Sequence, residues 1–195
     1  MSPVTHLLAG WVLANTTTLS RRERIAVTVA SVAPDIDGLG LLPELVTRNS
    51  AHPLLWFSDY HHALHTLWFA IAVTLLAATV ATHRWTTAGL AFVAFHLHLL
   101  CDLVGSRGPD GYTWPIPYLR PFSDRWQWSW RGQWPLNSWE NFVITFVLLL
   151  LTVVIVQRCG RSPVELFSTR ADQVVIAAIR SRLGRSRVPA GTDHS

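Results

Sequence analysis

Two apolar runs joined by only four residues constrain this chain most strongly. Residues 64–82 and 87–104 are each long enough to cross the roughly 30 Å hydrocarbon core of a bilayer as a helix. The connection, residues 83–86, is so short that the two helices must run antiparallel. The start of the first run and the end of the second therefore meet on one side of the membrane.

Ionisable side chains stand at the two ends that this hairpin brings together. His61 and His65 lie at the start of the first run. His98 and Asp102 lie near the end of the second. Residues four apart in a helix point about 40° from one another, so each pair can face one point. Imidazole and carboxylate are ligands of zinc and similar metals. Ionisable side chains inside a membrane span cost free energy, so those that occur there are candidates for a functional role. We therefore predict a membrane-embedded metal site.

Some neighbouring assignments stay open. His61 and His62 are adjacent, so at most one joins His65; the spacing favours His61, and the other would support a ligand or carry protons. Asp35 and Asp37 follow Pro34 in a predicted loop, where one could bind metal while the other orients a ligand or a water.

The composition favours a multi-pass membrane protein. Of the 195 residues 50% are hydrophobic and 14% charged, against about 25% charged in a soluble domain. The chain has no lysine, and seven arginines follow residue 157. An arginine-rich tail beside a span indicates topology and lipid contact, not nucleic-acid binding. It predicts a cytoplasmic C-terminal tail and a metal site on the outer face of the membrane.

The predicted fold is all-α, with about three strong transmembrane helices. Residues 142–156 supply the third, and residues 4–19 and 21–33 predict short re-entrant or interfacial helices. We expect a membrane-embedded metal-site domain over residues 1–160, an amphipathic surface helix over 161–184 and a disordered tail over 185–195.

Six of the ten tryptophans lie in a proline-rich segment, residues 105–140. Trp126, Trp128 and Trp130 alternate as in a short strand. The segment is typical of an aromatic belt at the headgroup level. It is also consistent, less strongly, with a lid over the metal site that touches lipid.

Six short motifs follow one another along the chain: Thr5-His6, Pro34-Asp35-Ile36-Asp37, His65-Thr66, His98-Leu-Leu-Cys-Asp102, Ser106-Arg107-Gly108-Pro109 and Trp114-Pro115-Ile116-Pro117. Over roughly residues 4–145 this order resembles the bacterial and archaeal inner-membrane metal-dependent hydrolases of the YdjM type. The histidine segment here is one residue shorter than the usual family pattern, which keeps both His61 and His62 open as ligands.

The resemblance implies a metal-dependent hydrolase of the inner membrane. A more distant similarity to the all-helical zinc-dependent phospholipase C enzymes implies one metal site formed by His65, His98, Asp102 and either Asp37 or Asp35. It also implies that His6 helps to bind a second metal and shares Asp102 with the first.

These observations favour hydrolysis of a phosphoester in a lipid or lipid-linked substrate. One or two ions, zinc first and Mn²⁺ or Fe²⁺ as alternatives, would activate a water. Asp35 or Asp37 would act as general base. Three arginines are candidates to bind the phosphate because guanidinium matches its geometry: Arg107, Arg120 and Arg125.

Three other functions fit the residues less well. A divalent-cation transporter would need polar groups across the bilayer, whereas the 142–156 run offers only Thr145 and Thr152. Haem ligation would use facing histidines but leaves Asp35, Asp37 and Asp102 without a role. The last alternative is a non-catalytic metal-binding membrane protein.

Overall fold

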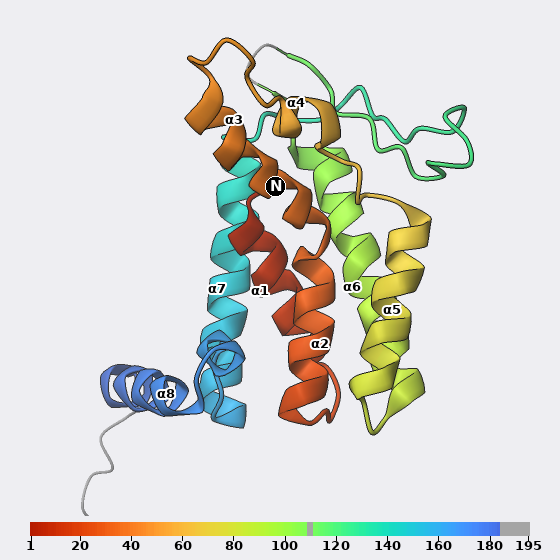
Figure 1. Cartoon of the computed structure of the whole chain (residues 1–195). Helices are drawn as coiled ribbons and strands as arrows, with labels where there is room; N and C mark the ends of the chain where they lie inside the picture. Colours follow the sequence, from red (N-terminus) through yellow and green to blue (C-terminus); the bar gives the residue numbers. More distant parts are fainter. Residues whose placement is uncertain (109–110, 184–195) are drawn as a thin grey trace, which may run out of the picture. The chain divides into compact units, whose positions relative to one another are not determined.

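The chain folds into helices, as predicted. The computed structural model describes residues 1–108 and 111–183, and these ranges contain eight α-helices and two short 3-10 helices. The predicted disordered tail, residues 185–195, lies outside them. The elements, labelled in Figure 1, are α1 (Pro3–Ala14), α2 (Arg21–Val32), η1 (Pro34–Gly40), α3 (Leu41–Thr47), α4 (Trp56–Tyr60), α5 (Leu67–Val80), α6 (Arg84–Gly105), α7 (Trp139–Cys159), η2 (Pro163–Leu166) and α8 (Thr169–Leu183).

Two helices are long and apolar enough to cross a membrane: α6, with 22 residues, and α7, with 21. A third candidate is the pair Arg21–Val32 and Pro34–Thr47, which bends by 54° at its break. Pro34 contributes to this break, because proline has no backbone N–H and cannot donate the next hydrogen bond of the helix. The run predicted to span the membrane over residues 64–82 is helical only over Leu67–Val80, since Thr66 caps the helix at its start.

The chain divides into two compact units, residues 1–149 and 150–195, and α7 begins in the first and ends in the second. The sequence placed the end of the membrane-embedded domain at residue 160. In the second unit, the buried Asp172 at the start of α8 accepts hydrogen bonds from the backbone N–H and hydroxyl of Ser162 through Oδ1. These bonds hold η2 against α8.

The first unit is a bundle in which α2 packs between α1 and α6, while α5 and α6 form the predicted antiparallel hairpin (Figure 1). A close approach joins α1 to α2. A Cβ atom on Gly10 would lie 2.0 Å from Oγ of Ser31, so only glycine fits there. Ser31 in turn donates a hydrogen bond of 2.8 Å to the carbonyl of His6. This contact fixes His6 beside the end of α2.

A capping interaction holds the opposite end of the bundle together. Glu23 and Ser20 form a reciprocal capping box at the start of α2. The buried carboxylate of Glu23 also accepts a 2.6 Å hydrogen bond from the backbone N–H of His83, in the turn between α5 and α6. The start of α2 therefore lies beside this turn.

The tryptophan-rich segment, residues 105–140, packs against the end of the bundle at which α5 begins. Ile116 and Trp128 form an isolated antiparallel bridge, and Tyr118 stacks on Trp128 with ring centroids 4.2 Å apart. The Tyr118 carbonyl accepts a hydrogen bond from the first residue of α5, Leu67. Trp126 and Trp130 are exposed. The segment therefore packs against this end of the bundle and carries exposed tryptophans.

Candidate metal centre

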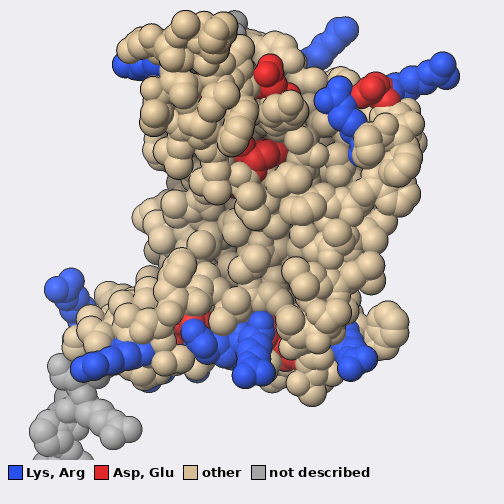
Figure 2. All heavy atoms as spheres, viewed as in Figure 1, with Lys and Arg blue, Asp and Glu red and all other residues tan. Residues whose placement is uncertain are grey.

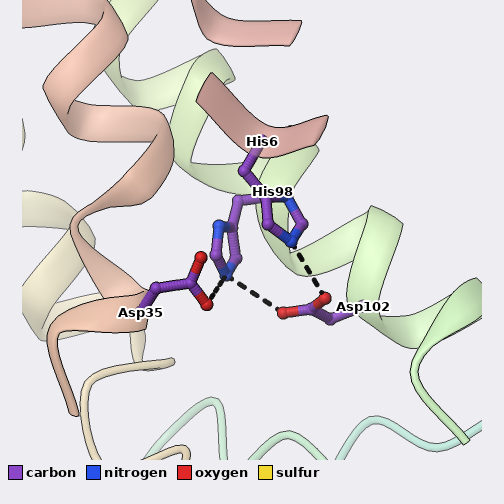
Figure 3. Close-up of side chains that lie close together, drawn as sticks. All are labelled: His6, Asp35, His98 and Asp102. Carbon is purple, nitrogen blue, oxygen red and sulfur yellow. Dashed lines mark hydrogen bonds and ion pairs between the residues drawn. The ribbon is translucent and has the colours of Figure 1, made fainter. Parts of the chain in front are cut away.

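Four side chains from three elements converge at this end of the bundle. His6 comes from α1, Asp35 from η1, and His98 and Asp102 from the last turns of α6 (Figure 3). Each offers one nitrogen or oxygen atom, and these atoms all lie within 4.8 Å of one another. Nε2 of His98 is 3.0 Å from Oδ2 of Asp102 and 3.7 Å from Oδ1 of Asp35. The i,i+4 pair predicted on α6 therefore faces one point.

Asp102 is the centre of this group. Its Oδ1 atom lies 3.2 Å from Nε2 of His6 and accepts a 2.8 Å hydrogen bond from the hydroxyl of Ser106. The amino group of Met1 also contacts Oδ1. Its Oδ2 atom faces two imidazoles, with Nε2 of His65 at 3.4 Å and that of His98 at 3.0 Å. Both carboxylate oxygens are thus surrounded by nitrogen and hydroxyl groups.

The outer nitrogens of two histidines are held by second groups. Nδ1 of His98 donates a 2.8 Å hydrogen bond to the carbonyl of Ser31, which can only accept. Nδ1 of His65 lies 3.3 Å from Oδ2 of Asp37. When neutral, both rings would then present an unprotonated Nε2 to the centre, and these two atoms are 3.2 Å apart. Two lone pairs at this distance repel unless a proton or a cation lies between them.

The donor set fits a divalent metal ion. Two imidazoles and two carboxylates match the ligands of zinc, and also suit Mn²⁺ and Fe²⁺. Metal-binding histidines usually direct the outer nitrogen to a carbonyl or a carboxylate, as His98 and His65 do here. Nδ1 of His6 and Oδ2 of Asp35 are buried without a hydrogen-bond partner among the described residues. His6, Asp35, His98 and Asp102 could hold the ion, and His65 points Nε2 at the same place.

Two of the three histidines between α4 and α5 have pKa values shifted in opposite directions in the metal-free protein. Burial disfavours the charged form of His65, but the carboxylates of Asp102 and Asp37 outweigh this effect and raise its pKa to about 9. Burial, together with the neighbouring His65 and His61, lowers the pKa of His62 to about 3. His62 is therefore a neutral imidazole over the physiological pH range.

The expectation that His61 and His65 share a helical face is wrong. Residues 61–64 form turns, and His62 has a positive φ of 76°, which a helix does not allow. The pair is nevertheless brought together by Asp37, because Nδ1 of His61 lies 3.3 Å from its Oδ1 atom. Asp37 thus contacts the Nδ1 atoms of these two histidines, whereas Asp35 belongs to the group of four possible metal ligands.

A cavity of about 900 Å³ opens onto Asp35, His61, His62 and Asp102. Trp114, from the segment that follows α6, packs against two of these histidines. Its ring centroid lies 5.0 Å from that of His61 and 5.3 Å from that of His62. The remaining walls are largely apolar or aromatic and include Leu39, Leu41, Phe57, Tyr112 and Leu136. The cavity therefore joins a polar floor to apolar walls.

The predicted phosphate-binding arginines lie outside this cavity, as does His96. None of the arginines proposed for phosphate binding is among its described lining residues. Arg120 pairs with Asp124 at 2.6 Å and Arg125 is exposed, whereas Arg107 precedes the lining residue Gly108. His96 lies on another face of α6, where its ring nitrogens contact the carbonyl of Phe92 and the hydroxyl of Tyr118.

Three supporting groups were not found from the sequence. Ser106 continues the i,i+4 series of His98 and Asp102, and this spacing could have revealed it. The carbonyl of Ser31 carries no sequence signal. Gln133, buried in the tryptophan-rich segment, donates a 2.8 Å hydrogen bond to the carbonyl of Asp102, and only the folded chain brings the two together.

Comparison with known proteins places the chain in a family. Neither a curated protein nor a solved structure matches it. The model of the YdjM inner membrane protein family matches residues 1–178, and the chain therefore belongs to this family.

Proposed function

We propose that this protein is a membrane-bound, metal-dependent hydrolase that acts on a phosphoester of a lipid or lipid-linked substrate. The proposal is carried by one observation, the two imidazole Nε2 atoms of His65 and His98 that face each other beside Asp102. A bundle at membrane depth has no structural need for so many buried ionisable groups. A divalent cation bound among them would compensate their charges and satisfy their lone pairs.

The chain's own residues prepare this centre for hydrolysis. When bound, a divalent cation such as zinc would supply Lewis acidity and lower the pKa of a coordinated water to about 7. The Ser31 carbonyl fixes the orientation of His98. Asp35 lines the cavity, and its Oδ2 atom, which has no hydrogen-bond partner among the described residues, would accept a proton from a water bound beside it. Asp37 orients His65 and is not placed to meet a substrate in the cavity.

The walls of the cavity favour an amphiphilic substrate. Leu39, Leu41 and Leu136 line it near its polar floor, and Trp114 covers the histidines. Such walls would receive the apolar part of a lipid while the phosphoester reaches Asp35 and Asp102. Among the three arginines, Arg107 is best placed to approach the phosphate, because it precedes Gly108 at the cavity.

Transport of a divalent cation is the main alternative, and the packing beneath the centre argues against it. The bundle between α1, α2, α5 and α6 is filled below this level by apolar clusters, namely Ala14, Leu19, Val27 and Ala94, and Ala30, Ala77 and Ala91. These side chains offer no ligand to an ion crossing a single protomer.

The arginines after α7 support an orientation in the inner membrane. A single crossing by α7 separates the residues before Trp139 from those after Cys159. The positive-inside rule then puts the arginine-rich C-terminal segment in the cytoplasm and the metal centre on the outer side.

Metal content and turnover test the proposal together. Protein purified in detergent would be compared with the double variant His98→Ala/Asp102→Ala, and with His96→Ala as a control on the same helix. Metal would be counted by mass spectrometry. Hydrolysis would be followed as phosphate release from phosphatidic acid and as release of the aryl alcohol from an aryl phosphodiester.

We expect one or two ions per chain in the wild type and in His96→Ala, with loss of metal and of turnover in the double variant. Metal binding without turnover on any phosphoester would reject the hydrolase and leave a metal-binding membrane protein. A wild type that stays empty after reconstitution would reject both.

A further inference from the structure

A groove of about 690 Å³ lies between α2 and α5, at the end of the bundle remote from the metal centre. It is lined by residues 22–29 of α2 and residues 73–80 of α5, whereas the metal centre lies where α2 ends and α5 begins. The walls are aliphatic: Ile25, Val29, Val73, Leu76 and Val80.

Small side chains explain why this space is open. α2 and α5 both pack against α6, and the contact among the three is made by Ala30, Ala77 and Ala91. Ala26 also lies beside this cluster and lines the groove. Alanines let the backbones approach α6 but do not fill the space between α2 and α5 on the outer side. The outer face of this contact is therefore a groove with a shallow, uncharged floor.

One cation stands at the end of this groove. Arg22 is the only charged residue among the described residues that line it, and its exposed side chain forms no hydrogen bond or ion pair with them. The hydrogen bond from His83 to Glu23 places this end beside the α5–α6 turn, where Trp85 is 90% exposed. Exposed tryptophan and arginine are typical of the headgroup level. On the face shown in Figure 2, charged side chains likewise gather towards the helix ends of the first unit and leave an uncharged band between them.

We propose that this groove binds an acyl chain of an anionic phospholipid whose phosphate pairs with Arg22. The aliphatic walls would contact the acyl chain and the guanidinium would pair with the phosphate, so one lipid molecule accounts for both features of the groove. A second copy of the chain fits less well, because a side-by-side copy would bring its own Arg21, Arg22 and Arg84 to the same level. The site is separate from the metal centre and does not depend on the hydrolase proposal.

Lipid retention in detergent tests this site. Native mass spectrometry would measure binding of palmitoyl-oleoyl phosphatidylglycerol and of phosphatidylcholine with the same chains. Arg22→Gln removes the cation, and Arg84→Gln is its matched control, an exposed arginine at the same end that does not line the groove. Val29→Trp fills the groove, and Val93→Trp is its control, because both valines are 50% exposed and Val93 lies on α6 outside the groove.

We expect the wild type to bind phosphatidylglycerol about fivefold more tightly than phosphatidylcholine, the effect of one arginine at an anionic headgroup. Arg22→Gln should abolish this preference and Arg84→Gln should keep it. Val29→Trp should lose both lipids and Val93→Trp neither. Circular dichroism and gel filtration would show that each variant folds, and if Val29→Trp does not, Arg22→Gln decides.

Equal binding of the two lipids by the wild type would overturn the proposal, as would equal losses in Arg22→Gln and Arg84→Gln. A concentration-dependent dimer that Val29→Trp disrupts would also overturn it and assign the groove to a second copy.

Discussion

Nε2 of His65 lies 3.2 Å from Nε2 of His98, and the second nitrogen of each ring already faces an oxygen atom. Without metal, a proton on His65 relieves the repulsion between the two rings, since Asp102 and Asp37 flank it. Proton and metal therefore compete for the same place. This competition makes the centre sensitive to pH.

The stability of the metal-free protein should fall as pH rises. The folded pKa of His65, about 9, is above its ordinary value of about 6.5. The stabilisation from its protonated form is complete below pH 6.5 and is lost as pH rises through 9. Thermal unfolding in detergent with a chelator should show a lower Tm at pH 9.5 than at pH 6.5, and His52→Gln, an exposed histidine, should not change this trend.

Zinc affinity should change in the opposite direction. A histidine must be neutral to bind metal, so binding releases the proton of His65 and becomes tighter towards pH 9. Calorimetric titration in buffers of different ionisation enthalpy would count the released proton. An affinity independent of pH between 6.5 and 8.5 would contradict this assignment.

Asp37→Asn should weaken metal binding without removing a residue of the four-residue group. The carboxylate of Asp37 faces Nδ1 of His65 and accepts a 3.1 Å hydrogen bond from the backbone of Leu64. Loss of such outer support typically lowers metal affinity 10–100-fold. Competition with a chromogenic chelator would measure it. Asp59→Asn, an exposed carboxylate on α4, is the control, and an equal affinity in both variants would remove Asp37 from the site.

Gln133→Leu should destabilise the end of α6 at Asp102. Gln133 is buried and donates to the carbonyls of Asp102 and Leu103, the latter at 3.3 Å. Leaving these carbonyls unpaired should lower the free energy of unfolding by about 1–3 kcal/mol. Gln127→Leu changes an exposed glutamine of the same segment and should have little effect on the Tm. A Tm equal in the two variants would show that the segment does not support Asp102.

Gly105→Ala should also lower stability, for a steric reason. A Cβ atom at this position would lie 2.5 Å from Oδ1 of Asn141 and 2.6 Å from Nε1 of Trp134, which are hydrogen-bonded to each other. Overpacking of this kind typically costs about 1–3 kcal/mol. Gly89→Ala, on the same helix, meets nothing within 4 Å and should stabilise the protein by roughly 0.5–1 kcal/mol. Opposite signs of the two Tm shifts are the expected result.

Local spacing predicted part of the centre correctly. His98 and Asp102 face one point because helical periodicity alone sets their directions. The short connection, predicted at residues 83–86 and found at residues 81–83, makes α5 and α6 an antiparallel hairpin. His6 was assigned to the site only through the family resemblance, because a single histidine in an apolar stretch has no spacing to interpret.

The sequence could not separate the roles of Asp35 and Asp37. We expected a loop, but the residues lie in a 3-10 helix, where positions two apart point about 120° away from each other. Asp35 therefore faces His98, and Asp37 faces His61 and His65 from behind. The positive φ of His62 likewise replaced the expected helical pair with a turn.

The sequence by itself determined that the chain is an all-helical membrane protein with ionisable side chains at one end of an antiparallel hairpin, because apolar length and helical spacing are local properties. Only the tertiary structure decided which atoms meet. Gly10 brings α1 against α2, Pro34 turns Asp35 towards α6, and Gln133 reaches Asp102 from another segment. These contacts depend on close packing between elements remote in sequence, which no local pattern encodes.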